Sequence, residues 1–264
     1  FEKSCIICLT GADFRPVMND KPIPLCQPLL VKEGALLQFR ALRKGARCYL
    51  SLWNELSLQQ WLRSYSTNVK AGAGGYKGRR LQNGDQLGFA VLSLPAVTNE
   101  VFTPLPWRYL DTNVYKNEVA FIPGHEWGWL TTKSQTHLLN NTFTVSTASD
   151  RMGYRLQGTA LEQQHREQVI SSAVGFGTVQ LLPNGQLIIL MADHQTTGGY
   201  PRIGHVISAD LPKLAQMQPG EDVRFEMTNH AIAEAGWIER QHYLMRLQNS
   251  CNLEMQNWVN ADRH

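Results

Sequence analysis

Residues 192–204 combine the side chains of a reactive site with flexible backbone. The candidate site residues supply a carboxylate, an amide, two hydroxyls, a phenol and two glycines: Asp193, Gln195, Thr196, Thr197, Tyr200, Gly198 and Gly199. A carboxylate can move a proton, and amide and hydroxyl groups can orient a substrate or stabilise a developing oxyanion. The same residues would also suit a polar hairpin in which Asp193 and the threonines bond turn amides. Spacing alone leaves both interpretations open.

Two apolar runs flank this segment, at 186–191 and 205–209, and their β-branched residues predict buried strands. Between the runs, Gly198 and Gly199 permit positive φ angles and a close approach of the backbone to a ligand. Pro201 removes a backbone donor and stiffens the exit. The sequence therefore predicts a shaped loop that joins two strands.

A second cluster lies at 66–79, where a glycine-dense stretch is flanked by two lysines and an arginine. The amides of Gly74 and Gly75, together with the ammonium group of Lys70, would suit an anion such as a carboxylate, carbonate or phosphate. The pattern matches neither a phosphate loop nor a dinucleotide fingerprint. A flexible surface loop is the alternative interpretation.

A third cluster, at 149–158, places Arg151 and Arg155 on either side of a glycine. Arginine is the cation that binds a planar carboxylate through two parallel hydrogen bonds, so the pair is a candidate anion site. In the alternative, Asp150 and Arg151 bond local backbone and Arg155 is solvated on a strand.

The cysteines and histidines predict no protein-bound metal. Cys5 and Cys8 have the C-x-x-C spacing, but they fall in an apolar strand and no second pair completes a zinc site. Buried, inert thiols are therefore expected at Cys5 and Cys8. The histidines show no ligand spacing, and no Gly-x-Ser-x-Gly elbow suggests a serine hydrolase. The five scattered cysteines argue against a disulfide framework and predict a reducing compartment.

The surrounding sequence predicts a mostly β protein with a few short helices and a C-terminal helix. Helical periodicity is concentrated at 231–247, where Thr228 or Asn229 can cap the helix. Elsewhere, short apolar runs separated by Gly, Pro, Asn and Asp predict strands at 4–9, 35–39, 47–52, 86–92, 142–145, 178–182 and 222–225. Such spacing is typical of β-barrels or sandwiches.

Prolines in the stretch 93–108 mark a linker, which predicts one domain at 1–95 and another at 105–264.

The net charge of +3 and the absence of long basic runs argue against a nucleic-acid partner. No stretch approaches the ~18 to 20 apolar residues of a membrane span, and there is no signal peptide. We therefore expect a cytoplasmic protein without a membrane partner, beginning inside a longer polypeptide.

Taken together, these clusters resemble the allophanate hydrolase subunit 2 family, also described as the biotin-dependent carboxyltransferase or Kip-type antagonist family. The resembling segments lie at 9–14, 45–50, 66–79, 123–124, 149–158, 177–180, 184–186, 193–202, 209–210 and 219–220. The most specific is Asp-x-Gln-Thr-Thr-Gly-Gly-Tyr-Pro at 193–201. The resemblance implies two cyclophilin-like β-barrel domains.

The best-defined enzymatic member of that family is the C subunit of bacterial 5-oxoprolinase, so the resemblance implies one polypeptide of a multi-subunit hydrolase. The complex would open a cyclic amide, 5-oxoproline, to glutamate with ATP. Its other members would be a smaller subunit of the Kip-inhibitor type (allophanate hydrolase subunit 1 family) and a lactam-opening subunit. Alternatives are a regulatory protein that antagonises a kinase inhibitor, and a carboxyltransferase component of a urea-carboxylase-like system. Biotin would then arrive on a separate carrier, because this chain has no Ala-Met-Lys-Met motif.

The chemistry at the motif positions suggests roles. Asp193 is the predicted proton carrier, with Gln195, Thr196 and Thr197 as orienting donors. The predicted substrate and anion contacts are Arg151, Arg155, Tyr200, Lys70, Gly74, Gly75, Gly198 and Gly199.

The chain departs from the family pattern in two places. The N-terminal family segment with its Ser-Gly-Ala-Met-Asp motif is missing, and it is expected to contribute to the site. Trp53-Asn54-Glu55 replaces Ala-Gly-Gly, and Arg63 replaces a usual glycine. A bulky loop there would narrow a pocket, or would suit a chain that kept a partner interface and lost turnover.

Overall fold

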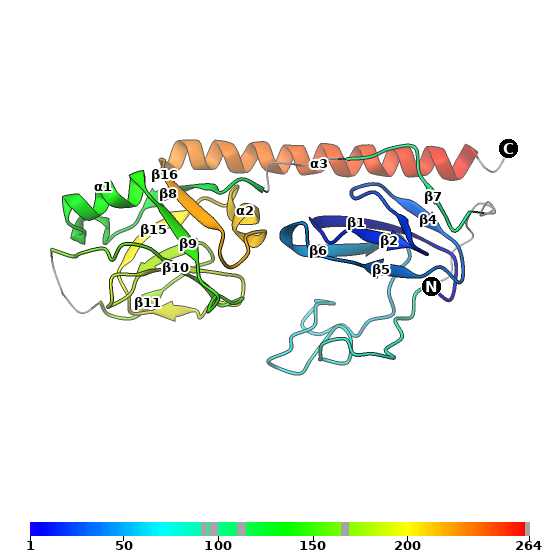
Figure 1. Ribbon diagram of the computed structural model, residues 1–264, viewed down its shortest axis with the longest axis horizontal. Helices are drawn as coiled ribbons and strands as arrows, with labels where there is room; N and C mark the ends of the chain where they lie inside the picture. The colour runs from blue at the N-terminus through cyan, green and yellow to red at the C-terminus, as the bar shows by residue number, and fades with distance from the viewer. Residues whose placement is uncertain (91–93, 95–99, 110–114, 165–168, 262–264) are drawn as a thin grey trace. The chain divides into compact units, whose positions relative to one another are not determined.

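The computed structural model describes residues 1–90, 94, 100–109, 115–164 and 169–261 (Figure 1). The chain forms two compact units. Unit 1 comprises Phe1–Lys44, Cys48–Leu110 and Glu254–His264, and unit 2 comprises Gly45–Arg47 and Asp111–Leu253. The domain limits 1–95 and 105–264 stay a prediction, and part of the predicted linker, 93 and 95–99, lies outside the described residues.

Unit 1 is built from two small antiparallel sheets. One has the strand order β6-β1-β4-β7 and the other the order β3-β2-β5. The strands are β1 (Cys5–Asp13), β2 (Pro16–Met18), β3 (Lys21–Pro22), β4 (Leu29–Val31), β5 (Leu37–Phe39), β6 (Lys44–Leu52) and β7 (Phe102–Pro104). Their core contains Ile7, Leu9, Met18 and Leu29. Cys5 is fully buried on β1, as predicted, and Cys8 is half-buried.

The strand predicted at 86–92 does not form over the described part, 86–90, where Phe89 makes an isolated bridge with Leu56. Leu87 is exposed and Phe89 is only half-buried against the core of unit 1, so this run lacks the continuous apolar face that would hold it in a sheet. Residues 91 and 92 lie outside the described residues.

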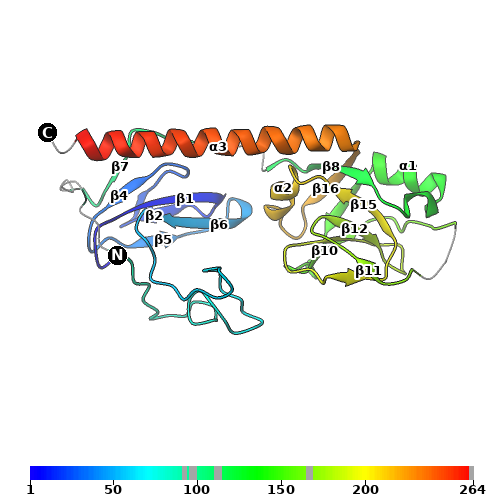
Figure 2. The same ribbon diagram turned by 180° about the vertical axis from the view of Figure 1, so that it is seen from behind.

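Unit 2 contains a closed barrel of seven strands in the order β10-β13-β12-β15-β8-β16-β9 (Figures 1 and 2). Its strands are β8 (Glu118–Pro123), β9 (Thr142–Val145), β10 (Gly153–Gln157), β12 (Thr178–Leu181), β13 (Leu187–Leu190), β15 (Arg202–Val206) and β16 (Asp222–Met227). Outside the barrel are the ribbon of β11 (Ser172–Ala173) with β14 (Thr197–Gly198), and the helices η2 (Trp127–Trp129), α1 (Thr132–Asn140) and α2 (Leu211–Ala215).

Side-chain alternation decides which residues face the barrel core. Val179, Leu181 and Ile189 belong to the buried core together with Phe121 and Phe143. Because successive side chains point to opposite faces of a strand, the residues between them face outward. Arg155, one of the predicted site residues, faces outward on β10 between the core residues Tyr154 and Leu156.

The C-terminal helix α3 (His230–Ala261) is longer than the predicted 231–247. Of the two predicted caps, Asn229 accepts a hydrogen bond through Oδ1 from the Ile232 amide at 3.0 Å. The stretch 248–261 lacks Gly and Pro, so nothing breaks the helix, although its apolar periodicity is weak. Met255 packs with Ile6, Leu30 and Leu105 of unit 1.

The structure agrees with a mostly β fold with few helices and a long C-terminal helix. Within the described part of the chain, no helix is both long and apolar enough to cross a membrane.

Candidate functional site

The loop that joins β13 to β15 carries the predicted catalytic residues, and its first end is fixed to the turn before β10. The Met191 amide donates to the carbonyl of Met152 at 3.0 Å, and the Asp193 amide donates to the carbonyl of Arg151 at 2.8 Å. These bonds continue the β10–β13 pairing beyond Gly153 and Leu190. The position of Asp193 is thus set by the edge of a rigid sheet.

Arg151 and Asp193 form a two-point ion pair. Arg151 donates from Nε to Oδ2 at 2.8 Å and from Nη2 to Oδ1 at 3.0 Å. The side chains are 66% and 40% exposed, respectively, so the pair lies at the surface, where such contacts add little stability. Paired N–H bonds of this kind fix the plane of the carboxylate. The structure therefore brings together two predicted site residues that are 42 positions apart.

The turn itself is held by Asp150, whose Oδ1 accepts from the amides of Met152 and Gly153 at 2.8 and 3.2 Å. Local bonding by Asp150 was one of the two interpretations of this cluster, whereas the guanidinium of Arg151 turns to Asp193. Arg155 lies on β10 opposite Ile188 and is exposed. Among the described residues, its guanidinium has no hydrogen-bond or ion-pair partner, so the structure does not join Arg155 to Asp193.

The middle of the loop forms one edge of the β11–β14 ribbon. Gly198 pairs with Ser172 and Thr197 with Ala173, and the carbonyl of Thr196 accepts from the Val174 amide at 3.1 Å. The side chains of Gln195, Thr196 and Thr197, which follow Asp193 in the sequence, are exposed. The ribbon thus presents the predicted donors to solvent.

One of the two expected reasons for Gly198 and Gly199, a positive φ angle, is wrong. Neither Gly198 nor Gly199 has a positive φ. A Cβ at Gly198 would lie 2.7 Å from Nε2 of Gln180, whereas a Cβ at Gly199 would lie 3.5 Å from its nearest neighbour, the carbonyl oxygen of Val169. Gly198 is needed because a buried amide packs against it, and Gly199 has ordinary space around it.

The second end of the loop is anchored by a buried ion pair that the sequence analysis missed. Glu126 accepts three hydrogen bonds from Arg202: from the amide at 2.9 Å, from Nε at 3.1 Å and from Nη2 at 3.0 Å. Burial disfavours the charged carboxylate, but these bonds and the charge of Arg202 outweigh it and lower the pKa of Glu126. Tyr200, two residues before Arg202, is exposed.

The glycine-rich cluster lies in unit 1 and is tied within that unit. Gly74 and Gly75 have positive φ angles, 69° and 54°. The Gly75 amide donates to the carbonyl of Gln59 at 2.8 Å, so this amide is already used. Lys70 is exposed. The roles of these three residues as anion contacts stay predictions.

Arg79 and Asp85 hold the far side of this loop. Arg79 donates to both carboxylate oxygens of Asp85 at 2.7 Å, and Tyr76 and the Gln82 amide donate to the same carboxylate. The hydrogen bonds from Arg79, followed by those from Gln82 and Tyr76, hold the pKa of Asp85 well below its usual range despite the opposing desolvation. The cluster is thus a braced loop.

The positions that depart from the family pattern also have a structural role. Asn54 is buried and donates from Nδ2 to the carbonyl of Ala90 at 2.8 Å, while Trp53 is half-exposed. Arg63 adopts a φ of 62°, in the left-handed region that favours glycine. The bulky residues are accommodated, with backbone strain at Arg63.

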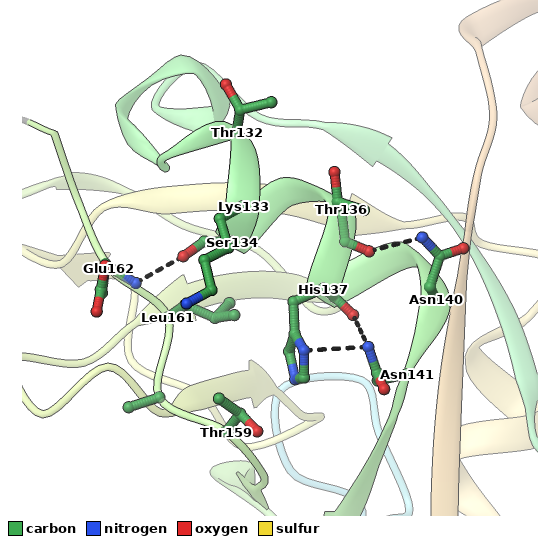
Figure 3. Close-up of a pocket in the computed structure, with 11 residues that line it drawn as sticks. Thr132, Lys133, Ser134, Thr136, His137, Asn140, Asn141, Thr159, Leu161 and Glu162 are labelled. Atoms are coloured by element: carbon green, nitrogen blue, oxygen red, sulfur yellow. Dashed lines mark hydrogen bonds between the residues drawn. The ribbon is translucent and has the colours of Figure 1, made fainter.

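A hollow of about 410 Å³ lies between α1 and the segment 159–162 of unit 2 (Figure 3). Its lining includes His137, Lys133 and Glu162, but none of the predicted site residues. Several of its polar groups already have partners: Ser134 Oγ accepts from the Glu162 amide, and Asn141 bonds His137. Within the described ranges, no three His, Cys, Asp or Glu residues are grouped so as to hold a metal ion.

Sequence comparison places these features in a family. Residues 1–227 match the family described as carboxyltransferase domain, subdomain A and B. The chain is 37% identical over 243 residues to the C subunit of 5-oxoprolinase from Haemophilus influenzae, covering 92% of this chain and 75% of that protein. It is 32% identical over 247 residues to the C subunit of 5-oxoprolinase from Escherichia coli, covering 94% and 77%.

Structural comparison agrees. The crystal structure of the Kluyveromyces lactis urea carboxylase matches with a TM-score of 0.74 at 25% identity, over 89% of this chain and 22% of that chain. The resemblance inferred from the motifs is confirmed: the chain belongs to the carboxyltransferase domain family, subdomains A and B.

Proposed function

We propose that this chain acts as the C subunit of a 5-oxoprolinase, a complex that opens the lactam of 5-oxoproline to glutamate with ATP. The similarity to two proteins of that name over most of the chain supports the assignment. The observation that carries the chemistry is the fixed carboxylate of Asp193, held by Arg151 at 2.8 and 3.0 Å. Exposed amide and hydroxyl side chains follow it along the same loop, at 195–197.

Opening a lactam requires three contributions. Water must add to the carbonyl carbon, the carbonyl oxygen must carry negative charge, and the nitrogen must gain a proton as the C–N bond breaks. In our proposal this chain and the lactam-opening partner subunit form one site, in which Asp193 takes the proton from the water and returns it to the nitrogen. Gln195, Thr196 and Thr197 stabilise the oxyanion, and the exposed guanidinium of Arg155 binds the substrate carboxylate.

The rest of the assembly belongs to the same proposal. The partners would be a smaller subunit of the Kip-inhibitor type and a lactam-opening subunit, in the cytoplasm, with ATP used by the complex. Tyr200, Gly198 and Gly199 would contact substrate, and Lys70, Gly74 and Gly75 an anion. We also propose that unit 1 is a second cyclophilin-like barrel, supported by its antiparallel sheets and by the family match over 1–227.

The test is ATP-dependent release of glutamate from 5-oxoproline by the chain assembled with its partner subunits. We expect Asp193→Asn to lower kcat by about 10²- to 10⁴-fold, the usual contribution of a positioned acid or base. The free energy of unfolding should change by less than about 1 kcal/mol, because the ion pair is exposed. Glu118→Gln is the matched control, since Glu118 pairs with Arg224 on the same barrel with similar exposure.

Unchanged kcat in Asp193→Asn would remove the catalytic role of that residue. Tight partner binding without turnover by the natural chain would favour the regulatory alternative. Carboxyl transfer from biotin on a separate carrier would favour the urea-carboxylase-like alternative.

A further inference from the structure

A buried polar side chain lies beneath the site loop, and the proposed reaction does not yet use it. Gln180 is 0% exposed, although it lies on the outer side of β12, between the core residues Val179 and Leu181. Its cover is the β11–β14 ribbon, since an ideal Cβ on Gly198 would lie 2.7 Å from Nε2 and 3.4 Å from Val174. The carboxamide is therefore enclosed between the barrel wall and the loop that carries the predicted donors.

The hydrogen bonding of this amide is incomplete. Gln180 Nε2 donates to the carbonyl of Tyr200 at 3.5 Å, which is long for such a bond. Within the described part of the chain, Gln180 Oε1 and the nearby Ser172 Oγ have no hydrogen-bond partner. A buried polar atom without a partner costs about 1 to 3 kcal/mol, so a leucine or methionine would be the more stabilising choice. A polar group kept at such a cost suggests a ligand.

Strand register shows what surrounds the amide. Gln180 lies opposite Ile188, which lies opposite Arg155, and on its other side Gln180 lies opposite Arg202. All four side chains face outward, because their neighbours along each strand are buried. Two strand spacings separate Gln180 from Arg155, a backbone distance of about 10 Å. A small molecule with a carboxylate on Arg155 would bring its other end to Gln180.

We propose that the Gln180 carboxamide is the subsite that binds the amide group of the substrate. A carboxamide offers an acceptor and a donor side by side, Oε1 and Nε2. It therefore complements a group whose N–H and C=O point the same way, as in a lactam or a urea. Oε1 would accept a hydrogen bond from the substrate N–H. Nε2 would exchange its hydrogen bond to the Tyr200 carbonyl for one to the substrate C=O. This inference rests on the proposed function and names the part of the substrate that the site recognises.

Entry requires the ribbon to move. The β11–β14 pair has two residues in each strand, and an isolated ladder of this size has little stability of its own. Gly198 provides the backbone approach over the amide that a side chain would block. The subsite would also suit both substrates named in the matched relatives, 5-oxoproline and urea, since each presents N–H and C=O on one side.

The experiment compares substrate analogues on the assembled complex without ATP. Calorimetry measures the Kd of 5-oxoproline and of the corresponding lactone, in which a ring oxygen replaces the N–H. A site that accepts from a substrate N–H rejects the analogue without it. We expect the natural chain to bind the lactam at least about tenfold more tightly, and Gln180→Met to bring this ratio close to one. The melting temperature of Gln180→Met should be unchanged or higher.

Gln157→Met is the matched control, because Gln157 lies on the outer face of β10 and is exposed. We expect it to keep the discrimination. Should Gln180→Met fail to fold, Gly198→Ala supplies the same test, because its Cβ would displace the carboxamide. Gly175→Ala is the tolerated counterpart, since a Cβ there would meet no atom within 4 Å.

Discrimination that survives in Gln180→Met, or a variant that is less stable yet discriminates normally, would overturn the subsite and give Gln180 a structural role. The result is separate from the proposed function. Glutamate release with unchanged discrimination rejects the subsite alone. N–H-dependent binding that Gln180→Met abolishes, in a complex that does not turn over 5-oxoproline, supports the subsite and rejects the reaction.

Discussion

Replacing Glu126 by Gln tests whether the buried ion pair with Arg202 anchors the site loop. The Glu126 side chain is 4% exposed and that of Arg202 is 25% exposed. Breaking a buried pair by removing one charge costs about 3 to 5 kcal/mol. Part of this loss is offset because Arg202 is partly exposed and water can solvate its charge. The amide oxygen of the new glutamine can also still accept a hydrogen bond from Arg202. We therefore expect the free energy of unfolding to fall by about 2 to 3 kcal/mol.

A loss of that size lowers the melting temperature of a unit of this length by about 5 to 10 °C. Calorimetric or circular dichroism melting measures it, with Glu118→Gln as the exposed control. The control should change by less than about 1 kcal/mol. Equal melting temperatures for the two variants would refute the reasoning, because the pair would then contribute no more than a surface contact.

The difference in the free energy of unfolding between the natural chain and Glu126→Gln should also depend on pH, which gives a second check. The pKa of Glu126 is lower in the folded chain than its ordinary value of 4.5, so the pair contributes in full above about pH 4.5. Its contribution is lost as the pH falls from there through the folded-state pKa. The natural chain and Glu126→Gln should therefore differ by a constant amount from pH 7 to about pH 5 and converge in stronger acid. A difference that grows on acidification would contradict this assignment.

Two further predictions concern unit 1. Asp85→Asn should speed tryptic cleavage at Lys77 or Arg79 several-fold, because Asp85 braces that loop through four hydrogen bonds. Mass spectrometry reads the cleavage, and cleavage no faster than in the exposed control Asp20→Asn would contradict the bracing role. Burial raises the pKa of Cys5 to about 11. Iodoacetamide at pH 8 should therefore modify Cys5 at least about 100-fold faster after denaturation than before, and similar rates would show that this thiol is accessible.

Local patterns predicted the parts of the fold that depend on local sequence. The strand expected at 142–145 is β9, and the apolar run 186–191 contains β13. The helix start at Asn229 followed from capping chemistry, whereas its end did not, since the last turns contact strands from the beginning of the chain. Sequence periodicity carries no signal for such distant packing.

The candidate site divides along the same line. The sequence predicted the polar motif at 193–201 and the arginine turn at 149–158 as separate clusters. The structure joins them through the two-point ion pair of Arg151 with Asp193, a contact that arginine commonly makes with a carboxylate. Gln180 was not visible, because a glutamine between Val179 and Leu181 predicts an exposed outer face. Its burial depends on the ribbon that pairs Gly198 with Ser172. The anchor formed by Glu126 and Arg202 was not visible either, because its two residues lie 76 positions apart in the sequence.

The residues that fix the position of the site loop differ from the residues proposed to act on the substrate. The groups that hold the loop are buried or belong to the backbone: Glu126 with Arg202 at one end and the β10–β13 ladder at the other. The groups proposed to act, Asp193 and the donors after it, are exposed and contribute little to folding. Substitutions should therefore fall into two classes. Changes at Glu126 lower stability first and activity through it, whereas changes at Asp193 lower activity in a chain that melts normally. Gln180 is the exception that identifies a ligand subsite, since its replacement by methionine should keep or raise stability while amide recognition is lost.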